Sequence, residues 1–319
     1  MKLWRFIFTG ARDAFLNMAL DEAILRSCQT GQASPTLRLY LWRPPGVSIG
    51  YFQSLEKTVD LNKCKKNNID VVRRITGGRA VLHENEITYS VCASAQEYPE
   101  LGENINETYQ KISFALLESL EALKVFGKWV KPNRERTGID STGSINSLKA
   151  SPRSIWFGVS SLQLTEDSYF SKPCFMSHSR YEITVEGKKL IGSAQRRFQD
   201  SFIQHGSLPL GNGKFNLADL LSIESLASEN KKKRVVKKNL EEKSTSLGKI
   251  LKRKVEYEEV ISALKKGFSK FFDVEMVEKE VTQKETETAQ VLKQKKYSTE
   301  EWNFRKRFLP TKEGRTLTF

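Results

Sequence analysis

The sequence predicts an α+β fold, in which a mixed β-sheet carries flanking helices and a small helical region follows towards the C-terminus. Short runs of β-branched and aromatic residues interchange with segments of helical periodicity, without the regular alternation of a parallel α/β sheet. The chain has 319 residues, of which 39% are hydrophobic, enough for one large domain with a small one beside it. We therefore expect a main domain over residues 1–225 and a basic linker with a small helical region over residues 226–319.

The first part of the chain holds the clearer local patterns. Apolar residues recur at helical spacing after Asp13, a residue type that caps helix N-termini. Three leucines alternate with larger polar or aromatic residues over residues 37–42, as in a half-buried strand. Taken in order, such patterns predict strands over residues 3–8, 37–42, 47–53, 69–72, 80–82 and 87–93, and helices over residues 13–27, 54–67 and 107–123.

The second part is less regular. Residues 131–154 are rich in Ser, Gly, Asn and charged residues and predict a surface loop, whereas residues 181–191 predict a hairpin with a Glu-Gly-Lys turn. Residues 228–246 are polar and rich in lysine, which indicates a linker or an exposed helix end. Amphipathic spacing predicts helices over residues 255–272 and 283–297.

Charge and cysteine usage narrow the class of protein. Residues 231–319 carry 24 Lys and Arg against 14 Asp and Glu, so +10 of the net charge of +14 lies in that third of the chain. A basic tail can bind nucleic acid, an anionic membrane or an acidic protein, and charge alone does not separate these partners. The four cysteines lack the spacing of a zinc site or a disulfide framework. No apolar run approaches the length of a membrane helix and no signal peptide is evident, so we expect a cytoplasmic protein.

The stretch RRITGGRAVLH, residues 73–83, combines three arginines, a Gly-Gly pair and a histidine directly after a predicted strand. Paired glycines let main-chain N–H groups approach a bound carbonyl or phosphate closely. An ordinary hairpin with solvated arginines explains the same residues equally well, because isolated glycine motifs are weak signals.

Cys174 and Lys189 are the residues that could carry covalent chemistry. Cys174 follows a proline between predicted strands and has lysines nearby in the sequence, and a cation that lowers a thiol pKa makes it nucleophilic near neutral pH. A buried apolar filler is the alternative for the cysteine, and an exposed strand position for the lysine. His83 and His205 could each be a core histidine with satisfied hydrogen bonds, and no third partner in the sequence implies a triad.

Taken together, these segments resemble the lipoate-protein ligase and octanoyltransferase family, whose fold is similar to the catalytic domain of biotin protein ligases. The matching blocks span nearly the whole chain and are specific in combination: NMALDEAIL at 17–25, LRLYLWRPPGVSIGYFQ at 37–53, RRITGGRAVLHENEITYSV at 73–91, EGKKLIGSAQRR at 186–197, QHGSLPL at 204–210 and YSTEEWNFR at 297–305. Two departures are a long connection over residues 131–172 and the lysine surplus at 231–238.

The resemblance implies a reaction. Cys174 lies fifteen residues before Lys189, and Arg79 stands where ligases usually have a third glycine, so the chain looks closest to octanoyltransferases of the LipM type. These enzymes carry the octanoyl group as a thioester on the cysteine, with the lysine beside it. The resemblance implies Cys174 and Lys189 as catalytic residues and the following as substrate-binding residues: Arg74, Gly77, Gly78, Arg79, His83, Gly192, Ser193 and Ala194.

The resemblance also implies the partners. The donor is octanoyl-acyl carrier protein, and the acceptor is a lysine of the glycine-cleavage H protein or another lipoyl domain. No metal, nucleotide or nicotinamide cofactor is implied, and neither nucleic acid nor a membrane is an expected partner. Three alternatives stay open: an ATP-dependent lipoate ligase with Cys174 incidental, an amidotransferase that moves octanoyl between lipoyl domains, and a noncatalytic binding protein with the same fold.

Overall fold

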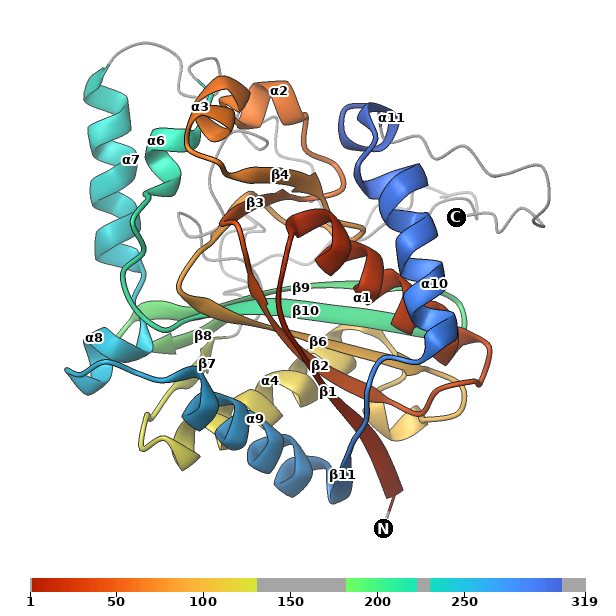
Figure 1. Ribbon diagram of the computed structural model, residues 1–319. Helices are drawn as coiled ribbons and strands as arrows, with labels where there is room; N and C mark the ends of the chain where they lie inside the picture. The colour runs from red at the N-terminus through yellow and green to blue at the C-terminus, as the bar shows by residue number, and fades with distance from the viewer. Residues whose placement is uncertain (1, 131–181, 223–229, 306–319) are drawn as a thin grey trace, which may run out of the picture.

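A computed structural model describes residues 2–130, 182–222 and 230–305, and a large mixed sheet runs through its centre (Figure 1). The sheet has eight strands in the order β11-β1-β2-β6-β10-β9-β8-β7. Strands β11, β1 and β2 pair in parallel, and the pairs from β2 to β7 are antiparallel. The strand bounds are β1 (Lys2–Arg12), β2 (Thr36–Trp42), β6 (Glu86–Ser94), β7 (Lys128–Val130), β8 (Glu182–Val185), β9 (Lys188–Arg197), β10 (Ser201–Pro209) and β11 (Val274–Glu278).

A smaller sheet lies over one face of the large one (Figure 1). It contains β3 (Gly46–Ile49) between β4 (Asp70–Arg73), which is parallel to it, and β5 (Val81–His83), which is antiparallel. The turn predicted after residue 72 therefore connects two strands of this small sheet.

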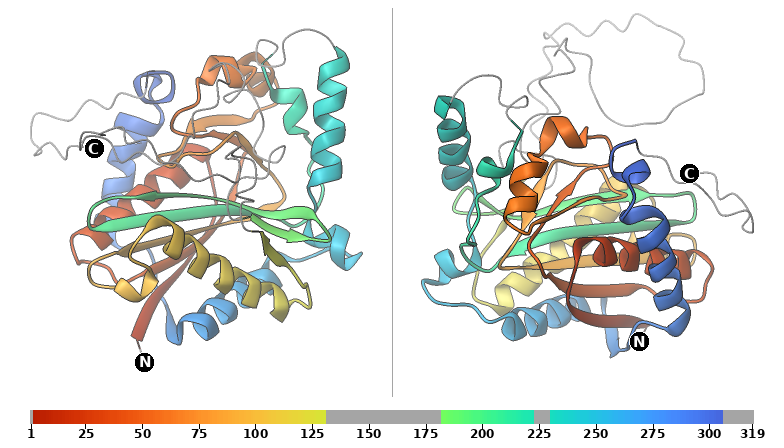
Figure 2. Two further views of the ribbon diagram at one scale, coloured as in Figure 1. Left: turned by 180° about the vertical axis from the view of Figure 1, so that it is seen from behind. Right: turned by 45° about the horizontal axis from the view of Figure 1, so that its top comes forward.

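Helices cover both faces of the large sheet. Helices α4 (Ile105–Ala122) and α9 (Tyr257–Phe272) lie together on one face, while α1 (Ala14–Gln29) and α10 (Gln283–Leu292) lie on the other (Figures 1 and 2). The remaining helical segments are α2 (Leu55–Thr58), α3 (Leu61–Lys66), η1 (Pro99–Leu101), α6 (Leu217–Leu220), α7 (Asn230–Lys243), α8 (Leu247–Leu251), η5 (Lys293–Tyr297) and α11 (Glu300–Asn303).

The large sheet has a hydrophobic core on each face, and both cores follow from the alternation of side chains along its central strands. In β2, Leu37 and Leu39 belong to the core under α4 and α9, whereas Tyr40 faces the core under α1. Trp4 and Ile7 of β1 divide in the same way. Successive residues of a strand point to opposite faces, so one apolar strand supplies both layers.

Most of the local predictions are confirmed, and so is the α+β class. The Asp13 side chain caps α1 by accepting from the N–H of Leu16, and the hairpin over β8 and β9 turns through Glu186 and Gly187, both with positive φ. Helices α9 and α10 occupy the two segments predicted near the C-terminal end.

The helix predicted over residues 54–67 is wrong as a single element. The structure has α2 and α3 instead, because Val59 is extended and bridges Leu221, and Asp60 then caps the second helix. The predicted linker over 228–246 contains α7, whose Val236 and Leu240 are buried.

The division of the chain near residue 225 stays a prediction. The later elements pack against the earlier ones, since β11 pairs with β1, and Arg5 forms a buried ion pair with Glu285 of α10. The region after residue 225 thus supplies a strand as well as helices. None of the described helices is long and apolar enough to cross a membrane.

Candidate active site

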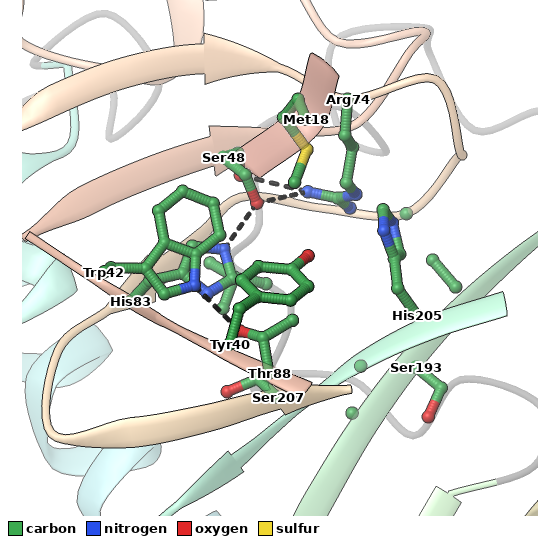
Figure 3. A pocket seen from close by; sticks show the side chains of 15 residues that line it. Met18, Tyr40, Trp42, Ser48, Arg74, His83, Thr88, Ser193, His205 and Ser207 are labelled. Carbon is green, nitrogen blue, oxygen red and sulfur yellow. Dashed lines mark hydrogen bonds between the residues drawn. The ribbon is translucent and has the colours of Figure 1, made fainter. Parts of the chain in front are cut away.

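A narrow pocket with a mostly apolar lining lies between the small sheet and the large one (Figure 3). Side chains from α1, β2, β3, β5, β6 and β10 reach it, and the backbone of β9 forms part of its wall. Six of the residues predicted to bind substrate line this pocket: Arg74, Gly78, His83, Gly192, Ser193 and Ala194. With the other lining residues included, five of the six matching sequence blocks meet at this pocket.

The Gly-Gly turn at residues 77–78 is held by an arginine whose guanidinium binds backbone oxygens of the protein. Arg74 is buried and donates to the carbonyl oxygens of Ser48, Gly77 and Arg79, so its guanidinium shapes the turn. Gly78 has φ +91°, a conformation that side chains disfavour. Gly77 and Arg79 thus contribute backbone oxygens to the shape of the turn.

The neighbouring Arg73 is completely buried and lines no described pocket. Its guanidinium donates to backbone oxygens of residues 50, 51 and 53 on one side and of Trp302 and Asn303 on the other. Burial lowers the pKa of Arg73 to about 10. The sequence block at 297–305 is therefore a support for the turn.

His83 forms the centre of a chain of hydrogen bonds at the pocket wall. Its Nε2 lies 2.7 Å from the hydroxyl of Ser48, and its Nδ1 lies 2.7 Å from a carboxylate oxygen of Glu86. The imidazole stacks on the indole of Trp42, with ring centroids 3.9 Å apart and planes 7° from parallel (Figure 3). Trp42 in turn donates to Thr88, which donates to Glu86.

His205 forms a second such chain. Its Nδ1 lies 3.1 Å from Asp21, and its Nε2 lies 2.6 Å from the hydroxyl of Thr76. Burial lowers the pKa of His205, against the opposing effect of Asp21. Burial alone would raise the pKa of Asp21, but the charge of Arg38 and the contact with His205 bring it below its usual value. The pair therefore consists of a neutral imidazole and a carboxylate at neutral pH.

No third partner for a triad is evident in the sequence, but each histidine has an acidic partner in the structure, Glu86 for His83 and Asp21 for His205. Sequence patterns alone did not single out Asp21 and Glu86, nor Ser48, Thr76 and Trp42. An acidic pair inside the apolar helical pattern at 17–25, and a glutamate at the start of an otherwise apolar strand, were the available signals.

Lys189 is buried away from the pocket lining and forms an ion pair with Glu182, with 2.5 Å between Nζ and Oε1. Cys174 lies outside the described residues. Within the described ranges, no group of three His, Cys, Asp or Glu side chains is arranged to hold a metal ion.

The β9 segment is fixed close to its neighbours by small residues. A Cβ on Gly206 would lie 2.7 Å from the carbonyl oxygen of Gly192, so β9 and β10 could not keep this approach with a larger residue. Tyr89 and Tyr109 hold Ser193 by its hydroxyl and its carbonyl oxygen. These contacts hold residues 192–194 in position at the pocket wall.

Comparison with known proteins places these features in one family. The lipoyl protein ligase A/B catalytic domain matches residues 13–269. The protein named octanoyltransferase LipM in Halalkalibacterium halodurans is 36% identical over 306 residues, covering 96% of this chain and 100% of that protein. Its namesake in Kyrpidia tusciae is 37% identical over 306 residues, with the same coverage of both chains.

Solved structures agree with the sequence comparisons. A bi-partite lipoate protein ligase from Thermoplasma acidophilum superposes with a TM-score of 0.72 at 25% identity, covering 95% of this chain and 97% of that one. A lipoate-protein ligase A bound with ATP gives a TM-score of 0.69 at 27% identity, covering 95% and 99%.

Proposed function

Because the chain belongs to the lipoyl protein ligase A/B catalytic-domain family and is an acyltransferase, we propose that it transfers octanoyl groups in lipoate synthesis. The donor is octanoyl-acyl carrier protein, and the group passes through a thioester on Cys174 to a lysine of a lipoyl domain, such as the glycine-cleavage H protein. The reaction takes place in the cytoplasm.

The observation that carries this proposal is the apolar pocket, whose lining residues come from the sequence blocks shared with the family. Its walls bring Gly78 and residues 192–194 against a mostly apolar space, which suits an acyl chain with its carbonyl at one end. Both full-length relatives described above carry octanoyltransferase names, which supports octanoyl as the group.

The thiol chemistry is assigned to Cys174 by the resemblance, and the three described cysteines are poorly suited to it. Cys28, Cys64 and Cys92 are buried, and burial raises the pKa of all three thiols. A thiol with a raised pKa is a poor nucleophile near neutral pH, because only the thiolate attacks. Cys174 lies outside the described residues, and its role here follows from the resemblance of the chain to thioester-forming octanoyltransferases.

Lys189 is assigned to the support of the thiolate and of the negative charge that develops on the carbonyl oxygen. Its ion pair with Glu182 fixes the position of the ammonium in the protein interior, where water screens a charge less than at the surface. Backbone amides around Gly77, Gly78 and Gly192 complete the oxyanion site in this scheme.

The test is an incubation with octanoyl-acyl carrier protein and apo H protein without ATP, followed by intact mass. We expect an octanoyl adduct on the enzyme, followed by acylated H protein, with both lost in Cys174→Ala. Cys64→Ala removes a buried thiol and is the matched control, which keeps the adduct. Acylation that requires ATP and free acid and survives Cys174→Ala would instead identify a ligase.

A further inference from the structure

Ser48, His83 and Glu86 form a continuous chain whose outer end opens on the pocket. Ser48 and His83 both line the pocket, and Glu86 lies behind them, buried, at the start of β6. The three side chains come from β3, β5 and β6, so the chain crosses from the small sheet to the large one.

The hydrogen-bond partners determine where the protons lie. Arg74 donates to the Ser48 hydroxyl oxygen at 3.1 Å, which leaves the hydroxyl proton free to be donated to Nε2 of His83, 2.7 Å away. Glu86 accepts from His83 Nδ1, from Thr88 and from Ser207. The imidazole therefore carries its proton on Nδ1 and presents Nε2 as a base.

The chain through His205 differs from the chain through His83 in the position of the hydroxyl that is bonded to Nε2. Thr76, which bonds Nε2 of His205, is not among the described residues that line the pocket. Asp21 also accepts from Arg38 and Tyr40, which ties that chain into the packing of α1 and β2. Both histidines line the pocket, but of the two hydroxyls bonded to their Nε2 atoms, only that of Ser48 belongs to a described lining residue.

We propose that Ser48, His83 and Glu86 form a proton relay that removes the proton of the lysine amine attacking the acyl-enzyme. This inference rests on the proposed octanoyl transfer through Cys174. It assigns the second half of the reaction to residues that are separate from the Cys174 and Lys189 pair.

The step balances as follows. The lone pair of the neutral ε-amine forms a C–N bond to the thioester carbonyl carbon, and the carbonyl π electrons move to oxygen. One amine proton passes to Ser48 Oγ while the Ser48 proton passes to His83 Nε2, and the carboxylate of Glu86 stabilises the imidazolium. The oxyanion lone pair then re-forms the C=O bond as the C–S bond breaks with its electron pair on sulfur, and the proton returns from His83 through Ser48 to the thiolate.

The test compares two nucleophiles on the same preformed octanoyl-enzyme. The wild type, Ser48→Ala and Glu86→Gln are acylated and isolated, and release of the acyl group is followed by intact mass with apo H protein or with hydroxylamine. Hydroxylamine attacks thioesters without a general base. We expect transfer to H protein to be about 100-fold slower in both variants, with release by hydroxylamine little changed.

Thr76→Val is the matched control, because it removes the equivalent hydroxyl from the His205 chain. It is expected to leave the ratio of the two rates unchanged. Variants of Ser48 and Glu86 in which both rates fall together, or neither falls, would overturn the relay while leaving the acyl transfer intact. A wild-type enzyme that forms no adduct on Cys174 overturns the proposed function and the relay with it.

Discussion

The ammonium of Lys296 lies 2.7 Å from a carboxylate oxygen of Glu22, and both side chains are almost completely buried. Tyr297 donates to the same oxygen, and Arg26 pairs with the other. Lys296 also lies 4.0 Å from the ring centroid of Trp302. This cluster fastens η5 and α11 to α1, and through them it supports Arg73.

Glu22 makes the fold sensitive to acid. Burial alone would raise its pKa, but Lys296 and Arg26 lower it to about 2, from 4.5. A carboxyl whose pKa is lowered in the folded state stabilises the fold at every pH above its pKa in the unfolded chain. This contribution is lost as the pH falls from 4.5 towards 2. The shift corresponds to about 3 kcal/mol. Urea unfolding at pH 5.5 and at about pH 3 measures the loss.

Replacing Glu22 isolates this effect. Glu22→Gln leaves Lys296 buried without its carboxylate, which should lower the free energy of unfolding at pH 7 by about 3–5 kcal/mol. The variant should also lose stability less steeply than the wild type between pH 4.5 and 2. An unchanged acid sensitivity would contradict the assignment.

The cysteines should differ sharply in reactivity. Burial raises the pKa of Cys28 and of Cys64 to about 12, and that of Cys92 well above its usual range. Iodoacetamide at neutral pH should therefore modify the native protein at no more than one position, which Cys174→Ala removes. Intact mass before and after unfolding in guanidinium checks this, since all four thiols should react after unfolding.

Gly50 should tolerate no side chain. A Cβ at this position would lie 1.9 Å from the carbonyl oxygen of Gly78, so Gly50→Ala must displace the Gly-Gly turn. We expect acyl-enzyme formation to fall at least tenfold in a protein that still folds, as judged by circular dichroism and intact mass. For comparison, a Cβ on Gly77 meets nothing within 4 Å, so Gly77→Ala should cost less stability than Gly50→Ala.

Glu182 should matter both for stability and for the first half of the reaction. Glu182→Gln removes the charge that pairs with buried Lys189, which should cost about 3–5 kcal/mol of unfolding free energy. It should also slow formation of the acyl-enzyme, because the ammonium loses the group that fixes its position. Stopped reactions analysed by intact mass separate this step from transfer to the H protein, and an unchanged first step would argue against Lys189 as the supporting cation.

Local sequence patterns were sufficient to predict the elements that are determined by residues close together in the chain. The cap at Asp13, the alternation in β2 and the turn through Glu186 and Gly187 are set by residues a few positions apart, and they were predictable from the sequence. The break between α2 and α3 was not, because its cause is the bridge between Val59 and Leu221, which are distant in the chain.

The site divides in the same way. The residues that line the pocket carry recognisable sequence blocks, so their grouping was predictable once the resemblance was stated. Two of the histidine contacts were not, because Asp21 and His205 are 184 positions apart, and Ser48 and His83 are 35 apart. Glu86 lies only three positions after His83, but their contact depends on the turn that joins β5 to β6. Only a fold that brings separate strands together shows which acid faces which imidazole. The catalytic roles of Cys174 and Lys189 stay predictions.

The anchoring of Arg73 by Trp302 and Asn303 has a consequence for the order of events during translation. These partners follow Arg73 by 229 and 230 positions, so the ribosome makes the turn long before the residues that fasten it. Contacts of such long sequence separation form late in folding. Until residue 303 has emerged from the ribosome, Arg73 lacks these partners, and the segment that leads into the Gly-Gly turn is held by fewer contacts.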